Sequence, residues 1–158
     1  MRAWLLVLAL LAPALHAATF SGTVTHVTDG DTLWVRPAGG GRPVQLRLLD
    51  LDAPEGFQRF GPEATAALRK RLHRQKVRVL TRGRDDYQRA LANVEHRGED
   101  MGAWMVRQGY AWSGVYRGRR GPYAALETQA RAERRGLWAQ GNALEPRAFR
   151  KRFGPCRR

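Results

Sequence analysis

The sequence has little of three things: cysteine, long apolar runs and negative charge. Cys156 is the only cysteine among 158 residues, which excludes an intramolecular disulfide and leaves an intermolecular one open. The longest apolar run, Ala3 to Leu15, is interrupted by Pro13. It is shorter than the roughly 20 residues that a membrane-spanning helix needs. The fold must therefore be stabilised by an ordinary hydrophobic core.

Residues 1–18 are typical of a signal peptide. Arg2 provides a positive start, the apolar run follows, and the small residues Ala17 and Ala18 form a cleavage site. We expect export to a periplasm or out of the cell, with an uncleaved N-terminal anchor as the alternative. The remaining chain is expected to form one domain over residues 19–140 and a basic tail over residues 141–158.

The shortage of acidic residues makes the chain strongly basic. It has 28 lysines and arginines against 14 aspartates and glutamates, a formal net charge of +14. Such a surface attracts polyanions, and nucleic acid is the expected partner. Anionic lipid or lipopolysaccharide would be attracted by the same charge. We expect no stable protein partner, no membrane span after signal cleavage, and a monomer.

Hydrophobic patterning and turn residues predict five strands and three helices. The strands are expected at residues 24–27, 33–36, 44–49, 77–80 and 91–95, and the helices from Gly61 onward, over residues 100–108 and over residues 122–135. Beyond Trp138 we expect an irregular, basic segment, which either binds phosphates nonspecifically or is disordered. The order of elements predicts an α+β, mainly β protein: a five-stranded OB-type barrel with three helices, an architecture that binds oligonucleotides on an open face.

Two short acidic segments lie at the ends of neighbouring predicted strands, Asp29 to Thr32 and Asp50 to Glu55. Each has a structural explanation: Asp-Gly favours a hairpin turn, and a proline follows a strand exit. Phosphodiester hydrolysis, however, requires an activated water and stabilised charge on the phosphoryl oxygens. Carboxylate and carbonyl oxygens suit Ca²⁺ or Mg²⁺ better than zinc. Strand alternation leaves Arg47, just upstream, facing either solvent or a groove.

Together with three further segments, the acidic segments resemble the staphylococcal nuclease family. The five segments are Val27 to Thr32, Arg47 to Glu55, Phe60 to Ala64, Asp85 to Arg89, and Val106 to Gly109. Their order and spacing match from Val24 to Trp138. The resemblance implies an OB-type barrel with three helices and Ca²⁺-dependent endonuclease activity on DNA and RNA, with single strands favoured.

The resemblance also implies a role for individual residues. The ion ligands fall on the carboxylates of Asp31 and Asp52 and on the backbone carbonyl of Ala53. The general base falls on Glu55, and the two phosphate-directed arginines on Arg47 and Arg89. Arginine suits this task because its planar fork matches phosphoryl oxygens. Three carboxylates gathered at one site would repel one another by about 4 kcal/mol per pair at 4 Å and an effective dielectric of 20, which favours a bound cation.

The chain departs from the family pattern where the substrate would be held. Gln88 stands where the family usually has glycine, and Asp86 where the staphylococcal enzyme has a lysine. Recognition of a terminal phosphate is therefore in doubt. Tyr87 and Tyr116 are the candidate substrate-binding aromatics, with a packing role as the alternative for Tyr116.

Two other functions stay open. An inactive nucleic-acid-binding barrel would keep the fold, although the five acidic and arginine residues named above are all present. A cationic envelope-binding protein would use the charge but leaves the acidic segments unexplained. His26, His73 and His96 lack zinc-site spacing, and no glycine-rich phosphate loop or nucleophilic serine motif occurs.

Overall fold

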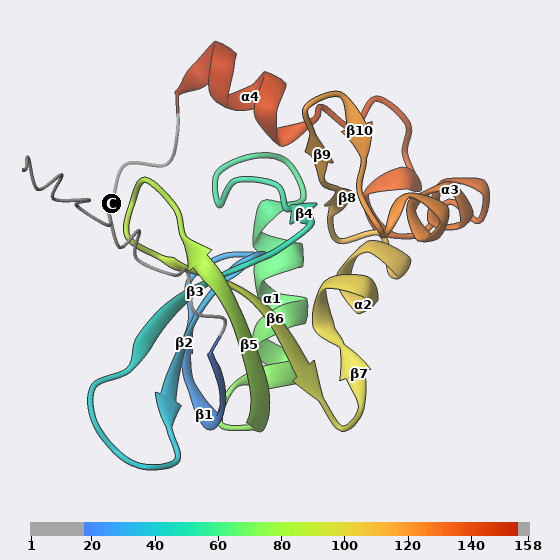
Figure 1. Cartoon of the computed structure of the whole chain (residues 1–158). Coiled ribbons are helices and arrows are strands. Elements are labelled where there is room, and N and C mark those ends of the chain that lie inside the picture. Colours follow the sequence, from blue (N-terminus) through green and yellow to red (C-terminus); the bar gives the residue numbers. More distant parts are fainter. Residues whose placement is uncertain (1–17, 155–158) are drawn as a thin grey trace, which may run out of the picture.

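Five strands close into a barrel in the computed structural model, which describes residues 18–154. They are β1 (Thr19–Val27), β2 (Thr32–Pro37), β3 (Val44–Leu48), β5 (Lys76–Arg84) and β6 (Ala90–His96). Neighbouring strands pair antiparallel in the order β3-β2-β1-β5-β6, and a parallel pairing of β3 with β6 closes the ring (Figure 1). The predicted signal peptide up to Ala17 and Cys156 lie outside the described residues.

Side-chain alternation along the strands explains the barrel core. In β6 every second residue, from Ala90 through Ala92 and Val94 to His96, is buried. In β1 an irregular register between Val24 and His26 keeps both Val24 and Val27 inside. The interior is thus filled by small and branched apolar side chains, as a barrel of five strands requires.

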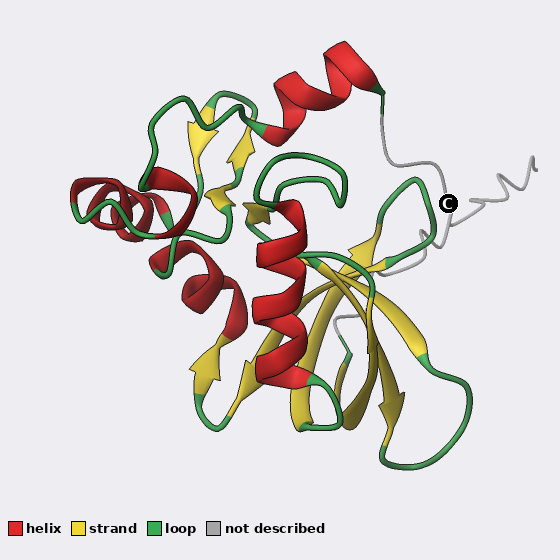
Figure 2. Ribbon diagram, turned by 180° about the vertical axis from the view of Figure 1, so that it is seen from behind, coloured by secondary structure: helices red, strands yellow, loops and turns green. Residues whose placement is uncertain are grey.

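Helix α1 (Gly61–Leu72) packs on the barrel with one apolar stripe. Ala64, Leu68 and Leu72 recur at helical spacing and are fully buried. Pro62 occupies the first turn, where a missing N–H costs nothing, and Glu63 faces the positive end of the helix dipole. Figure 2 shows α1 lying along the strands on the far side from the view of Figure 1.

A second layer of short elements lies beside the barrel. It consists of β4 (Leu51–Asp52), β7 (Glu99–Asp100), α2 (Met101–Arg107), β8 (Trp112–Ser113), β9 (Val115–Tyr116), β10 (Arg119–Arg120), α3 (Ala124–Ala132) and the 3-10 helix η1 (Gly136–Trp138). Asp100 caps α2 by accepting hydrogen bonds from the amides of Gly102 and Ala103. β4 pairs with β8, which ties this layer to the chain that leaves the barrel after β3.

The predicted fold class is confirmed, and one helix was missed. All five strands and three helices form, with the last predicted helix shortened to α3. The expectation of irregular chain beyond Trp138 is wrong for α4 (Pro146–Phe153), which begins at a proline and packs Phe149 against Phe57 with ring centroids 5.1 Å apart. Because basic residues dominate α4, hydrophobic periodicity in the sequence does not predict this helix or its apolar contact. Over residues 18–154, none of the helices has the length and apolar character that crossing a membrane requires.

The loop between β5 and β6 explains why glycine is usual at one of its positions. Gln88 has a φ of 63°, in the left-handed region that side chains with a Cβ rarely adopt. Its amide donates to the carbonyl of Asp85, and its own carbonyl accepts from Arg84. Both bonds use the backbone of Gln88 and neither uses its side chain, so the turn would accommodate glycine.

Replacing Gln88 by glycine is expected to stabilise the protein by about 1 kcal/mol, because the strained φ is relieved. Urea denaturation measures the change. Asp86→Gly is the control: its φ is not positive, so the substitution is expected to destabilise through added freedom of the unfolded chain. A Gln88→Gly variant less stable than wild type would contradict this account of the turn.

Candidate active site

Asp31 is buried at the turn between β1 and β2, and its carboxylate joins two segments of the chain. Its Oδ2 accepts a hydrogen bond from the amide of Ala53 at 3.1 Å, and its Oδ1 accepts one from the Thr32 hydroxyl at 3.0 Å. The Asp31 amide in turn donates to the side chain of Asp29 at 3.1 Å, as in an Asx turn. The segment is therefore a hairpin turn and also a contact with the second acidic segment.

A glycine permits this close approach. A Cβ added at Gly30 would lie 2.7 Å from the Cβ of Ala53 and 3.1 Å from that of Ala64. The two acidic segments thus meet at a point where only a residue without a side chain fits.

The side chain of Arg47 points toward the carboxylates of Asp31 and Asp52 and not into solvent. Its Nη1 lies 2.5 Å from Asp31 Oδ2, and its Nη2 donates to Asp52 Oδ1 at 3.2 Å. One guanidinium on β3 therefore links a carboxylate of the β1–β2 turn with a carboxylate of β4. The buried Nη1 has no well-directed hydrogen-bond acceptor among the described residues, so this donor is oriented by charge alone.

The loop from Glu55 to Gly61 is folded tightly and fixes the backbone of Glu55. The amides of Gln58 and Gly61 donate in succession to the carbonyls of Glu55 and Gln58, both at 2.8 Å. The buried side chain of Gln58 accepts from the Glu55 amide at 3.1 Å and donates to the carbonyl of Leu144 at 2.5 Å. Gln58 is thus a positioning residue that no sequence motif marks.

Arg89 lies beside the site but is held by its own loop. Its Nε and Nη2 both lie 2.7 Å from Asp85 Oδ2, and its Nη1 donates to the Thr32 hydroxyl at 3.2 Å. Since Thr32 also contacts Asp31, one hydroxyl separates Arg89 from the acidic residues. The structure brings Asp31, Asp52 and Arg47 into one connected network and places Arg89 at its edge.

A third arginine joins the network from α4. Arg150 donates to both oxygens of Asp52, at 3.1 and 2.8 Å, and to Glu55 Oε1 at 2.9 Å. Arg150 was not among the predicted site residues, because it lies in a run of basic residues with no distinguishing motif. The contact connects the end of the described chain with the acidic loop.

The two aspartates have opposite electrostatic character. Burial by itself would raise the pKa of Asp31, but the charge of Arg47 and the hydrogen bond from Ala53 outweigh it and hold the pKa below its usual range. Burial raises the pKa of Asp52 above its usual range, and the nearby charge of Asp31 adds to the increase, against the effect of Arg150. Asp31 is therefore a firmly ionised anchor, while Asp52 gains from any added positive charge.

The candidate aromatic residues are exposed. Tyr87 is 74% exposed and Tyr116 72% exposed. Each has an arginine near its ring, with Arg89 5.4 Å from the centroid of Tyr87 and Arg117 5.2 Å from that of Tyr116. Exposure at this level disfavours the packing role for Tyr116 and leaves both rings available for stacking.

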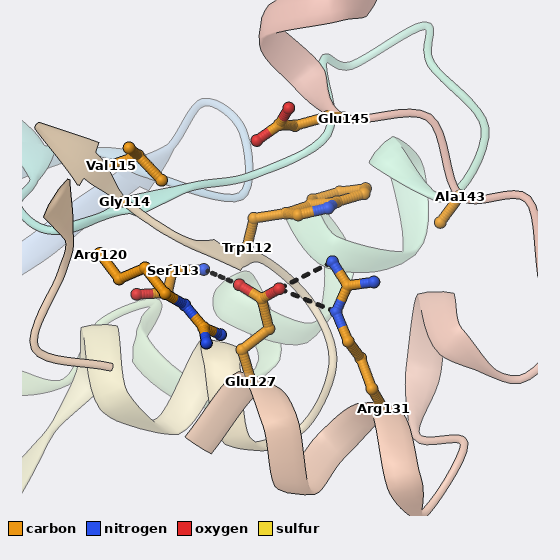
Figure 3. A pocket seen from close by; sticks show the side chains of 9 residues that line it. All are labelled: Trp112, Ser113, Gly114, Val115, Arg120, Glu127, Arg131, Ala143 and Glu145. Atoms are coloured by element: carbon orange, nitrogen blue, oxygen red, sulfur yellow. Dashed lines mark hydrogen bonds and ion pairs between the residues drawn. The ribbon is translucent and has the colours of Figure 1, made fainter. Parts of the chain in front are cut away.

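A separate polar pocket lies between β8, α3 and the chain before α4 (Figure 3). Its volume is about 260 Å³. The buried Glu127, which lines the pocket, accepts from the amide of Ser113 at 2.7 Å and pairs with Arg131 at 2.7 Å. Because Glu127 is satisfied by these partners, it serves to hold β8 and hence, through the β4–β8 pairing, the strand that carries Asp52.

The donor atoms suit a hard divalent cation, although the site is not a ready-made cage. Within residues 18–154, no three acidic, histidine or cysteine side chains converge on one point. Asp31 and Asp52 do converge, since both contact Arg47. A cation here would take the remaining ligands from backbone carbonyls such as that of Ala53 and from water, as Ca²⁺ with its six to eight oxygen ligands does.

Fold and site together define an OB-type barrel whose rim carries converging carboxylates flanked by arginines. The model of the family described as staphylococcal nuclease homologues matches residues 45–140. This range includes Arg47, Asp52, Glu55 and Arg89, while Asp31 lies upstream of it. The chain belongs to the staphylococcal nuclease family.

Individual relatives cover most of the chain. An uncharacterized endonuclease of Haemophilus influenzae is 34% identical over 128 residues, which are 81% of this chain and 71% of that protein. Protein ParB of Escherichia coli is 37% identical over 93% of this chain and 87% of its own length. A micrococcal nuclease of Shigella flexneri is 36% identical over 85% of this chain and 82% of its own length.

Gly61 is expected to be indispensable for the loop that carries Glu55. A Cβ at this position would lie 1.9 Å from the carbonyl oxygen of Glu55, so Gly61→Ala must displace backbone and cost about 1–3 kcal/mol. Chemical denaturation measures the loss. Gly39→Ala is the matched control, because its Cβ would meet no atom within 4 Å. Equal stability of the two variants would contradict the close packing of the loop.

Proposed function

We propose that the protein is an exported, Ca²⁺-dependent endonuclease that hydrolyses phosphodiester bonds of DNA and RNA. The observation that carries the proposal is the network in which Arg47 joins Asp31 to Asp52 while the neighbouring loop holds Glu55. Membership of a nuclease family supports the reaction class. The N-terminal residues that predict export lie outside the described range, and export is part of the proposal on sequence grounds.

The residues divide the work according to their chemistry. Asp31, Asp52 and the carbonyl of Ala53 would hold the Ca²⁺ ion, which when bound supplies charge stabilisation at a phosphoryl oxygen. Glu55 accepts a proton from the attacking water, because a carboxylate oxygen can act as general base and the Gln58 contacts fix the Glu55 backbone. Arg47 and Arg89 donate to phosphoryl oxygens on which charge accumulates in the transition state.

The substrate strand would lie across the basic rim of the barrel. The exposed rings of Tyr87 and Tyr116 offer stacking surfaces, and the adjacent arginines offer charge. Stacking on exposed aromatics requires unpaired bases, which favours single strands over duplexes. Asp86, which is exposed in the same loop as Tyr87, disfavours a terminal phosphate at this point.

Removing the proton acceptor is expected to abolish most activity. Glu55→Gln keeps the shape of the side chain but cannot accept the proton, so cleavage of single-stranded DNA in Ca²⁺ is expected to fall about 10²- to 10⁴-fold. Chelation of Ca²⁺ is expected to suppress cleavage by the wild-type protein. Glu133→Gln is the control, because Glu133 is exposed just after the end of α3 and lies outside both acidic segments. Cleavage that survives both Glu55→Gln and chelation would refute the mechanism, and binding without cleavage by the wild type would identify an inactive nucleic-acid-binding barrel.

Changing either phosphate-directed arginine to lysine is expected to lower kcat about 10²-fold, because a point charge replaces a fork that matches two oxygens. Arg47→Lys and Arg89→Lys are compared with Arg78→Lys, a strand residue whose side chain is 64% exposed. Steady-state cleavage of a labelled oligonucleotide measures the effect. If Arg47→Lys and Arg89→Lys retained the kcat of Arg78→Lys, the two arginines would have no role in the transition state.

A further inference from the structure

Helix α4 places an arginine between the two carboxylates at which the proposed chemistry would occur. Arg150 is 98 residues from Asp52 and 95 from Glu55 in the sequence, yet it bridges them. Its Nη1 donates to both carboxylates, and its Nη2 donates to the second oxygen of Asp52. Arg47 also donates to Asp52 Oδ1, so this oxygen accepts from two guanidinium groups.

These contacts use the same oxygens that a cation and its water would need. An oxygen that accepts a short hydrogen bond from a guanidinium directs electron density toward that group. A divalent cation placed beside the same guanidinium would be repelled by it. Arg150 and a hydrated cation therefore exclude each other from the space between Asp52 and Glu55.

The helix that carries Arg150 is lightly attached. Of its eight residues only Pro146 is buried, and the Arg150 side chain is 32% exposed. Apart from Arg150, the attachment includes the Phe149–Phe57 ring contact and the Gln58 hydrogen bond to Leu144 just before the helix. Both Figure 1 and Figure 2 show α4 at the margin of the molecule, over the loop that joins β4 to α1. Elements with so few buried contacts move at low free-energy cost.

We propose that Arg150 is a resident counter-cation of the active site, which leaves Asp52 and Glu55 when Ca²⁺ and nucleic acid enter. The inference rests on the proposed function, because it requires a site that takes a cation. The phosphates of an incoming strand offer the released guanidinium acceptors of matching geometry. Calcium and nucleic acid therefore bind cooperatively. Ca²⁺ takes the carboxylates from Arg150 and so frees its guanidinium for phosphate, while phosphate draws Arg150 away from the carboxylates that Ca²⁺ needs.

Calcium affinity tests the proposal without relying on catalysis. Isothermal titration of the full chain with Ca²⁺ compares Arg150→Gln with Lys151→Gln, which removes the same charge from an exposed position on the same helix. Arg150→Gln is expected to bind Ca²⁺ on the order of tenfold more tightly than Lys151→Gln, because only the former removes a guanidinium that is hydrogen-bonded to Asp52 and Glu55. Without Ca²⁺, Arg150→Gln is expected to have a lower Tm than Lys151→Gln. Saturating Ca²⁺ is expected to remove this difference in Tm.

A non-hydrolysable oligonucleotide provides the second measurement. A phosphorothioate single strand is expected to raise the Ca²⁺ affinity of the wild-type protein more than that of Arg150→Gln, because the variant has no arginine to withdraw. Equal increases in the two proteins would overturn the proposed cooperativity.

The calcium titration also separates this proposal from the proposed nuclease function. Calcium affinity of Arg150→Gln equal to or weaker than that of Lys151→Gln would overturn the counter-cation role, whatever the activity. Loss of cleavage by Arg150→Gln at saturating Ca²⁺ with unchanged affinity would instead make Arg150 a substrate-binding residue. Absence of cleavage by the wild type would refute the nuclease function and leave the calcium titration to decide the role of Arg150.

Discussion

The hydrogen bond from the Ala53 amide to the Asp31 carboxylate is the contact on which the site depends. A buried carboxylate is costly unless it is paired and hydrogen-bonded, and Asp31 has both kinds of partner in Ala53 and Arg47. The contact brings the β1–β2 turn against the chain that leaves β3. Gly30 makes the approach possible, because a side chain there would collide with Ala53. Without this close approach, the β1–β2 turn with Asp31 would not lie against the segment that carries Asp52.

The barrel was predictable because its determinants are local. Alternation of apolar residues and the turn residues between them placed all five strands, and Asp100 marked the start of α2 as a cap. The fourth helix was not predictable in this way. The sequence of α4 has only a few apolar residues among arginines and lysines. This composition is equally typical of a solvated tail.

The positions of the acidic candidate residues were easier to predict than those of the arginines, and the roles of both stay predictions. Asp31, Asp52 and Glu55 occur in short segments whose order is distinctive, whereas an arginine in a basic chain carries little information by itself. Predicting which way Arg47 points required the register of β3 in the sheet. Predicting that Arg150 reaches the site required the path of α4. Some of the positive charge is also used internally, since Arg71 and Arg107 both pair with Glu99. Net charge therefore indicated the kind of partner without locating the surface.

The parallel pairing of β3 with β6 has a consequence for when the site comes into existence. Arg47 faces Leu91 across this pairing, and Arg89 lies just before β6 begins. The seam that closes the barrel is thus also the seam along which the two sides of the site meet, and neither side holds the full set of residues before closure. On the proposed function, a newly made chain is harmless to the nucleic acid of the cell that makes it until folding is complete. Threading an unfolded chain across a membrane would then protect the producer without a separate inhibitor.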